Sequence, residues 1–232
     1  MDRKFVEAYR LSLFGRMAMG VAHEVDNHLS VVIGFSEIMQ VHASNPDKVQ
    51  DNAKRILMAG ERIAGLIKQY SNYVRPHARE LEFFSVRQTI LDILLFARYD
   101  LERKGNTIEA PLSHTPWLVY GDRRDFALAL LALFFNAVEA LPEKGGVVSI
   151  KVSMDAGGCT ISVTDNGAGI PAGMEETIFE EGVTTRHEIF NRGMGLPTAR
   201  HIIAEADGEL KLENAPGGGC VATIRLPAMS GA

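Results

Sequence analysis

Apolar side chains recur at alternating intervals of four and three residues over the first 75 residues, and this spacing constrains the fold more than any other feature. One series occupies residues 14–39 and a second occupies residues 49–74. Such heptad spacing is typical of packed α-helices. Pro46 separates the two series and suits the first turn of a helix, with Asn45 as its cap. The sequence therefore predicts an α-helical hairpin.

An isolated helical hairpin leaves apolar surface uncovered, because each helix faces only one partner. Dimerisation into a four-helix bundle would bury the remainder. We therefore expect a homodimer that forms through the hairpin. The alternative is a monomeric hairpin that packs on the second half of the chain.

The hydrophobic pattern changes after Pro76. Apolar residues at helical and then at alternating spacing predict an α+β two-layer sandwich. The expected helices are 86–103, 122–141 and 196–206, and the expected strands are 146–154, 159–164, 209–213 and 220–226. We expect a helical dimerisation domain at 1–75, a linker at 76–84 and an α+β domain at 85–232.

Composition narrows the class of protein. Hydrophobic residues make up 46% of the chain and the net charge is −5, which argues against a nucleic-acid partner. No apolar run is long enough to cross a membrane, and the start of the sequence has no apolar signal core. Cys159 and Cys220 lack metal-ligand spacing and suit a reducing compartment. These features predict a cytoplasmic protein without membrane insertion.

Three polar or glycine-rich elements stand out in the second half. Asp165 ends a predicted strand and is followed by Gly167 and Gly169. Gly193-Met194-Gly195 opens a predicted helix, whose free amides attract phosphate. Asn136 lies inside an otherwise apolar helix and offers an oxygen to a hard cation. Each element alone could be an ordinary turn or a core asparagine.

Taken in order, these elements resemble the ATP-binding domain shared by histidine kinases, type II topoisomerases, mismatch-repair ATPases and a heat-shock chaperone. The resemblance implies that Asn136 binds Mg²⁺ and that Asp165 accepts a hydrogen bond from the adenine amine. It also implies that Gly193 and Gly195 contact the phosphates beneath a lid. The other ATP-binding residues that it implies are Gly167, Gly169, Thr184, Thr185, Arg186 and Leu196.

The segment Ala22-His23-Glu24-Val25-Asp26-Asn27-His28-Leu29 resembles the phosphoacceptor box of histidine kinases, and the resemblance then covers nearly the whole chain. It implies three catalytic residues. His23 attacks the γ-phosphate of ATP, and Glu24 orients or deprotonates its ring. Asn27, one helical turn from His23, supports dephosphorylation of the partner. That partner is the receiver domain of a response regulator, whose aspartate takes the phosphoryl group from His23.

The chain departs from this pattern at three positions. His28 stands where the family usually has proline, Ala132 where it has a second asparagine, and Cys220 where it has threonine. Ala132 argues against a simple ATP hydrolase, because the topoisomerase and chaperone relatives carry a catalytic glutamate there. Ala132 and His28 also favour an alternative function, a degenerate kinase that acts as a nucleotide-binding dimeric scaffold.

Overall fold

A computed structural model describes residues 1–75, 78–102, 105–183 and 193–227. The chain forms two compact units. The helical unit is Phe14–Arg75, and the sandwich unit combines Met1–Leu13 with Pro76–Ala232. The first thirteen residues therefore group with the C-terminal part of the chain. The domain limits 1–75, 76–84 and 85–232 stay a prediction.

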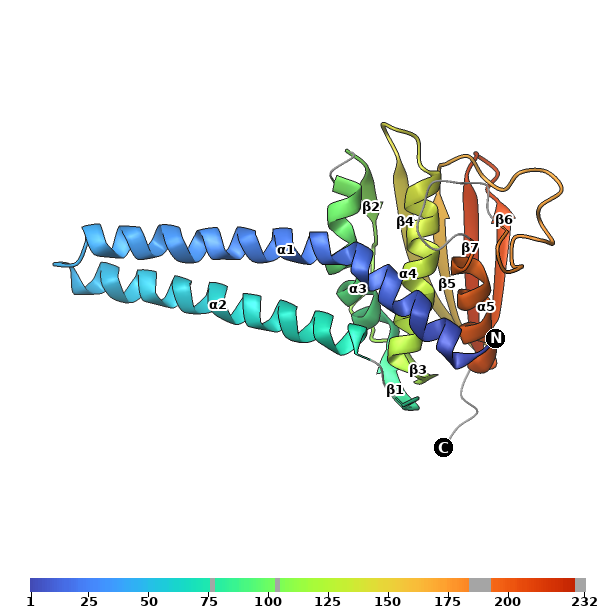
Figure 1. Ribbon diagram of the computed structural model, residues 1–232, viewed down its shortest axis with the longest axis horizontal. Coiled ribbons are helices and arrows are strands. Elements are labelled where there is room, and N and C mark those ends of the chain that lie inside the picture. The colour runs from blue at the N-terminus through green and yellow to red at the C-terminus, as the bar shows by residue number, and fades with distance from the viewer. Residues whose placement is uncertain (76–77, 103–104, 184–192, 228–232) are drawn as a thin grey trace. The chain divides into compact units, whose positions relative to one another are not determined.

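The helical unit is the expected hairpin of two long helices, α1 (Arg3–Val41) and α2 (Pro46–Val74) (Figure 1). Asn45 caps α2, because its side-chain oxygen accepts a hydrogen bond from the amide of Lys48 at 3.1 Å. The ring of Phe14 stacks on that of Tyr73, with centroids 5.8 Å apart. Tyr70 donates a hydrogen bond to the Phe14 carbonyl at 2.8 Å. Aromatic contacts thus join the two helices at this end of the hairpin.

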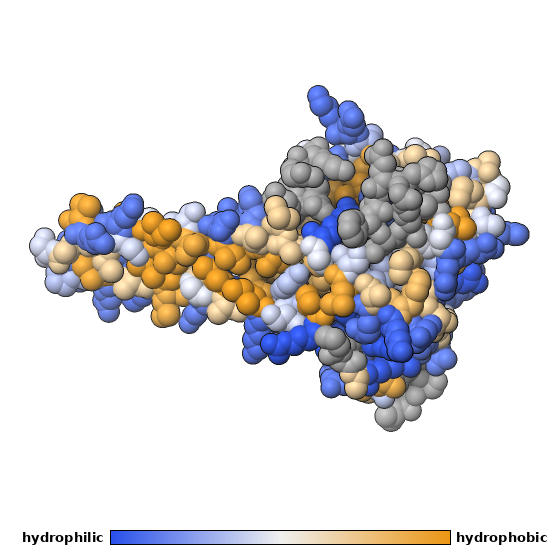
Figure 2. All heavy atoms as spheres, viewed as in Figure 1, coloured by the Kyte–Doolittle hydropathy of each residue, from blue (hydrophilic) through white to orange (hydrophobic). Residues whose placement is uncertain are grey.

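Much apolar surface of the hairpin is exposed in the single chain. Figure 2 shows apolar residues gathered along these helices. The large exposed side chains are Met19, Leu29, Val31, Ile33, Ile38, Val41, Leu57, Met58 and Ile67. A surface of this kind is typical of a helix pair that packs against a further partner.

The sandwich unit has a five-stranded sheet with the strand order β2-β4-β5-β7-β6. β2 pairs with β4 in parallel, and the other neighbours are antiparallel. Three helices form a layer over the sheet (Figure 1), so the expected two-layer architecture is confirmed. The strands are β2 (Thr107–Glu109), β4 (Val147–Asp155), β5 (Gly158–Asp165), β6 (Glu209–Asn214) and β7 (Cys220–Pro227), and the helices are α3 (Val86–Glu102), α4 (Arg123–Ala140) and α5 (Gly195–Glu205).

The middle helix, α4, forms the centre of this unit. Asp122 caps it by accepting hydrogen bonds from the amides of Arg124 and Asp125. Nearly every residue from Asp125 to Val138 is buried, as expected for a helix that is apolar on all sides. Asn136 is the exception, since it is only partly buried. It therefore lies where α4 meets the surface of the unit.

A second, two-stranded antiparallel sheet joins β1 (Glu82–Ser85) to β3 (Leu118–Gly121). These strands and the three-residue strand β2 are not among the elements expected from the sequence. No helix among the residues that the structure describes is long and apolar enough to cross a membrane.

Candidate nucleotide and phosphoacceptor sites

Asp165 is the last residue of β5 and is buried. Its Oδ1 accepts hydrogen bonds from the amide of Gly167 at 2.8 Å and from the amide of Cys220 at 3.2 Å. Two backbone donors on one oxygen fix the position of the carboxylate. A carboxylate held in this way at the end of a strand can accept a hydrogen bond from an exocyclic amine, as the sequence analysis expects of Asp165.

Two positions near Asp165 have room for glycine alone, because backbone of another segment lies close to them. A Cβ on Gly219 would lie 2.0 Å from the Asp165 carbonyl oxygen, and a Cβ on Gly167 would lie 2.3 Å from the Ala140 carbonyl oxygen. Neither distance is compatible with a side chain. The turn after β5 therefore packs directly on the end of α4 and on the loop before β7.

Two asparagines hold the turn that follows Asp165. Asn166 accepts a hydrogen bond from the amide of Val147 at 2.8 Å and donates one to the Gly145 carbonyl at 3.0 Å. Asn214, the last residue of β6, accepts from the amide of Ile170 at 2.6 Å and donates to the Ile170 carbonyl at 3.1 Å. The sequence analysis gave neither residue a role. The gap between the expected strands 209–213 and 220–226 indicated a turn near residue 214, but nothing local linked it to residue 170.

The segment Gly193-Met194-Gly195 leads into α5, and Gly195 lies close to Asn136. A Cβ on Gly195 would lie 3.6 Å from both amide heavy atoms of Asn136. The N-terminus of α5 has no side-chain cap, since Met194 makes no capping hydrogen bond. Backbone amides at such a terminus favour phosphate oxygens. The fold thus brings together Asn136 and Gly195, which lie far apart in the sequence.

Of the remaining candidate ATP-binding residues, the structure describes Gly169, Gly193 and Leu196. Gly193 has a φ of +67°, and its carbonyl accepts a hydrogen bond from the amide of Gly182 at 3.2 Å. Gly169 has a φ of +72°, and Leu196 is partly buried in the first turn of α5. The predicted ATP-binding residues Thr184, Thr185 and Arg186 lie outside the described residues.

Two of the departures from the family pattern lie within this site. Ala132, one turn before Asn136, is fully buried. Its methyl group offers no oxygen, which leaves Asn136 as the candidate oxygen donor of this pair. Cys220 is half-buried beside Asp165. Burial, and then the Asp165 carboxylate, raise the pKa of the Cys220 thiol to about 11. The thiol is therefore protonated at neutral pH and is a weak hydrogen-bond donor.

The candidate phosphoacceptor lies on α1 in the helical unit. His23 is exposed, and its Nδ1 lies 3.3 Å from Nδ2 of Asn27. The Glu24 carboxylate lies instead beside His28, with 3.6 Å between Oε1 and Nε2. The structure thus brings Asn27 to His23 and pairs Glu24 with His28. His28 is one of the three positions that depart from the family pattern.

Comparisons with known proteins agree with this arrangement. Residues 121–230 match the family described as histidine kinase-, DNA gyrase B- and HSP90-like ATPase. Sporulation kinase C of Bacillus subtilis is 30% identical over 230 residues, which cover 99% of this chain and 52% of that protein. The histidine kinase AtoS of Escherichia coli is 26% identical over 226 residues, or 97% of this chain and 37% of that protein. The chain thus spans about half the length of these relatives, or less.

Solved structures show the same relationship. The catalytic domain of histidine kinase ThkA covers 64% of this chain, with a TM-score of 0.56 and 26% identity, and 97% of that domain is matched. ThkA in complex with the response regulator protein TrrA has a TM-score of 0.56 and 25% identity, and covers 95% of this chain and 64% of that one. The resemblance to a sensor histidine kinase catalytic core is therefore confirmed. These relatives are named as kinases, and the family matched by residues 121–230 is described as ATPase-like.

Proposed function

We propose that this chain uses ATP and Mg²⁺ to phosphorylate its own His23, and that the phosphoryl group then passes to an aspartate of a response-regulator receiver domain. The observation that carries the proposal is an exposed histidine, contacted by Asn27, in a chain that also holds Asp165 at the end of the middle strand of an ATPase-type fold. The complex of ThkA with a response regulator supports a partner of that class.

The donor atoms near Gly195 suit a magnesium nucleotide. No cluster of three or more acidic, cysteine or histidine side chains among the described residues could hold a metal ion. An amide oxygen with few other protein ligands fits Mg²⁺, which keeps waters and binds substrate phosphates. Asn136 would hold the ion, and Mg²⁺ would neutralise phosphate charge. The α5 amides would bind phosphate oxygens and Asp165 the adenine amine.

Transfer to His23 needs a neutral ring with a lone pair on the attacking nitrogen. We propose Nε2 as that nitrogen, because Nδ1 is engaged by Asn27. With its amide turned about, Asn27 accepts a hydrogen bond from Nδ1–H through its carbonyl oxygen, and the lone pair of the ring then lies on Nε2. The bond from Nε2 to the γ-phosphorus then forms as the bond to the ADP oxygen breaks. Once Glu24 has separated from His28, its carboxylate would take the Nδ1 proton from the phosphorylated ring. In the reverse role, Glu24 and Asn27 would support dephosphorylation of the regulator.

The exposed apolar side chains of the hairpin support a homodimer as part of the same proposal. Dimerisation through α1 and α2 would remove them from water. We also propose that the protein is cytoplasmic, as its cysteine content leads us to expect.

The test is incubation of the purified chain with γ-labelled ATP and Mg²⁺, beside His23→Ala and the control His42→Ala. We expect acid-labile, alkali-stable label in the unaltered chain and in His42→Ala, and none in His23→Ala. ATP binding without label in any of the three would refute the kinase activity and favour the scaffold function.

A further inference from the structure

The first thirteen residues of the chain pack on the sandwich unit rather than on the hairpin. Along this N-terminal segment (Met1–Leu13), the side chains of Val6, Tyr9 and Leu13 are almost completely buried. Their spacing of three and four residues places them on one face of α1. The segment is thus a docked amphipathic helix, and its apolar face lies against the unit that carries the nucleotide site.

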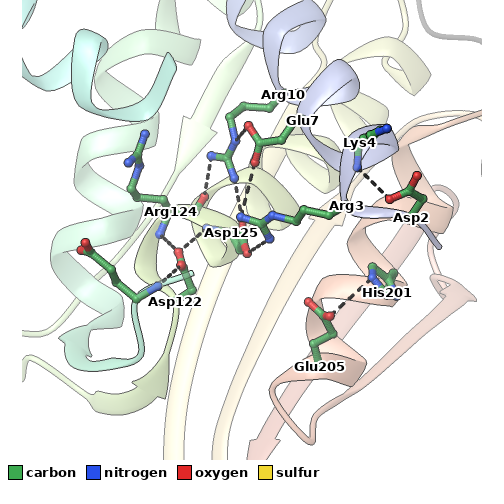
Figure 3. A network of polar contacts seen from close by, with 11 residues as sticks. Asp2, Arg3, Lys4, Glu7, Arg10, Asp122, Arg124, Asp125, His201 and Glu205 are labelled. Carbon is green, nitrogen blue, oxygen red and sulfur yellow. Dashed lines mark hydrogen bonds and ion pairs between the residues drawn. The ribbon is translucent and has the colours of Figure 1, made fainter. Parts of the chain in front are cut away.

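Two ion pairs hold the N-terminal segment at the start of α4 (Figure 3). Arg3 Nη1 lies 2.5 Å from Oδ2 of Asp125, and Arg10 Nη2 lies 2.5 Å from Oδ1 of the same carboxylate. Glu7 lies 3.3 Å from each arginine, so two positive and two negative groups balance. The Arg10 side chain is 0% exposed. A buried guanidinium with matched partners is costly to separate while it stays buried.

Tyr9, next to Arg10, reaches the candidate phosphate site. Its hydroxyl oxygen lies 3.0 Å from the point that a Cβ on Gly195 would occupy. The same point lies 3.6 Å from the amide atoms of Asn136. Tyr9 is only 4% exposed. Its ring therefore fills space beside the two groups that we assign to phosphate and to Mg²⁺.

We propose that the N-terminal segment and the phosphates of ATP compete for this face of the sandwich unit. The inference rests on the proposed function, because it takes Gly195 and Asn136 as the phosphate and metal ligands. A magnesium-bound triphosphate with its waters needs the space at the start of α5 that Tyr9 fills. The docked segment therefore lowers the fraction of molecules able to bind ATP, and the apparent affinity falls by that fraction.

The affinity test compares Arg10→Ala and Tyr9→Ala with Lys4→Ala. Lys4 is the matched control, since it lies in the same segment and is exposed. We expect the calorimetric Kd for MgATP to fall roughly tenfold in the first two variants, and to stay unchanged in Lys4→Ala. Adenosine, which has no phosphates, should bind all four proteins equally. An unchanged Kd for MgATP overturns the inference, and so does an equal gain for adenosine.

A second measurement uses the unaltered chain and does not depend on how the variants fold. Trypsin cleaves after Arg10 only when that buried side chain is released. We expect MgATP to speed this cleavage, as followed by mass spectrometry, and adenosine not to. Cleavage that MgATP leaves unchanged or slows overturns the inference. If the chain and its variants bind neither ligand, the proposed function itself fails, whereas equal binding by all of them defeats the competition alone.

Discussion

Replacing Gly219 by alanine should remove most of the affinity for ATP, because Gly219 touches the backbone of Asp165. A Cβ at this position would lie 2.0 Å from the Asp165 carbonyl oxygen and 2.7 Å from its carbon. Backbone atoms cannot swing aside as the end of a long side chain can. Asp165 would have to move, and its hydrogen bonds with Gly167 and Cys220 would be stretched.

The cost of this substitution has two parts. Gly219 has a φ of +86°, and an L-residue in the left-handed region costs about 1–2 kcal/mol. Relief of the overlap with Asp165 costs about 1–3 kcal/mol more, as for other overpacked sites. The sum is about 2–5 kcal/mol. If half of it falls on the position of the carboxylate, the Kd for ATP rises roughly five- to sixtyfold.

The control is Gly217→Ala in the same turn. A Cβ on Gly217 meets no atom within 4 Å. We expect Gly217→Ala to bind ATP as the unaltered chain does, and Gly219→Ala to bind at least fivefold more weakly. Calorimetry would be run at a temperature at which circular dichroism shows both variants folded. Equal Kd values for the two variants would refute the role given to Asp165 and its contact with Gly219.

Two further predictions test the turn and the dimer. Asn214→Ala removes two hydrogen bonds to Ile170, each worth about 1 kcal/mol, and should weaken ATP binding several-fold by calorimetry, whereas Lys211→Ala on the same strand should not. An unchanged Kd would mean that Ile170 is held without Asn214. Leu57→Glu should raise the dissociation constant of the dimer at least about hundredfold in sedimentation experiments, because each subunit loses a leucine that is 62% exposed in the single chain and that the dimer would bury. The control Lys54→Glu changes a polar side chain, and equal sedimentation of both variants would place the dimer interface elsewhere.

Local sequence was sufficient to predict the hairpin and the glycine turns. Heptad spacing and the Asn45-Pro46 pair depend only on neighbours along the chain. The second helix begins at Pro46 as expected, whereas α1 begins at Arg3, well before the apolar series at residues 14–39. The glycines after Asp165 were informative for the same reason, because a close backbone approach leaves room for glycine alone. The helix α4 was recognisable from its apolar length, and Asn136 from being the polar exception within it.

The missed features depend on contacts between distant positions. Asn214 meets Ile170 across 44 residues, and Arg10 meets Asp125 across 115. Arginine and glutamate at helical spacing near the start of a chain predict a solvent-exposed helix face. Only the fold shows that Arg10 is buried. The strands β1, β2 and β3 have three or four residues each, too few for an alternating pattern to be distinguished from a loop.

The two experiments on the N-terminal segment must agree with each other, because a coupling between two binding events is reciprocal. If the docked segment excludes MgATP and lowers the apparent affinity tenfold, about nine in ten free molecules are docked, and saturating MgATP must release the segment from them. A gain in affinity in Arg10→Ala therefore requires faster cleavage after Arg10 when MgATP is added to the unaltered chain.

The length of α4 explains how one segment could contact both ends of the helix. Asp125 and Asn136 are eleven residues apart, about 16 Å along a helix, and the side chains of Arg10 and Tyr9 reach one end each. Any input that separates Arg3 and Arg10 from Asp125 would then withdraw Tyr9 from Gly195, and the nucleotide site would respond without a change in its own residues.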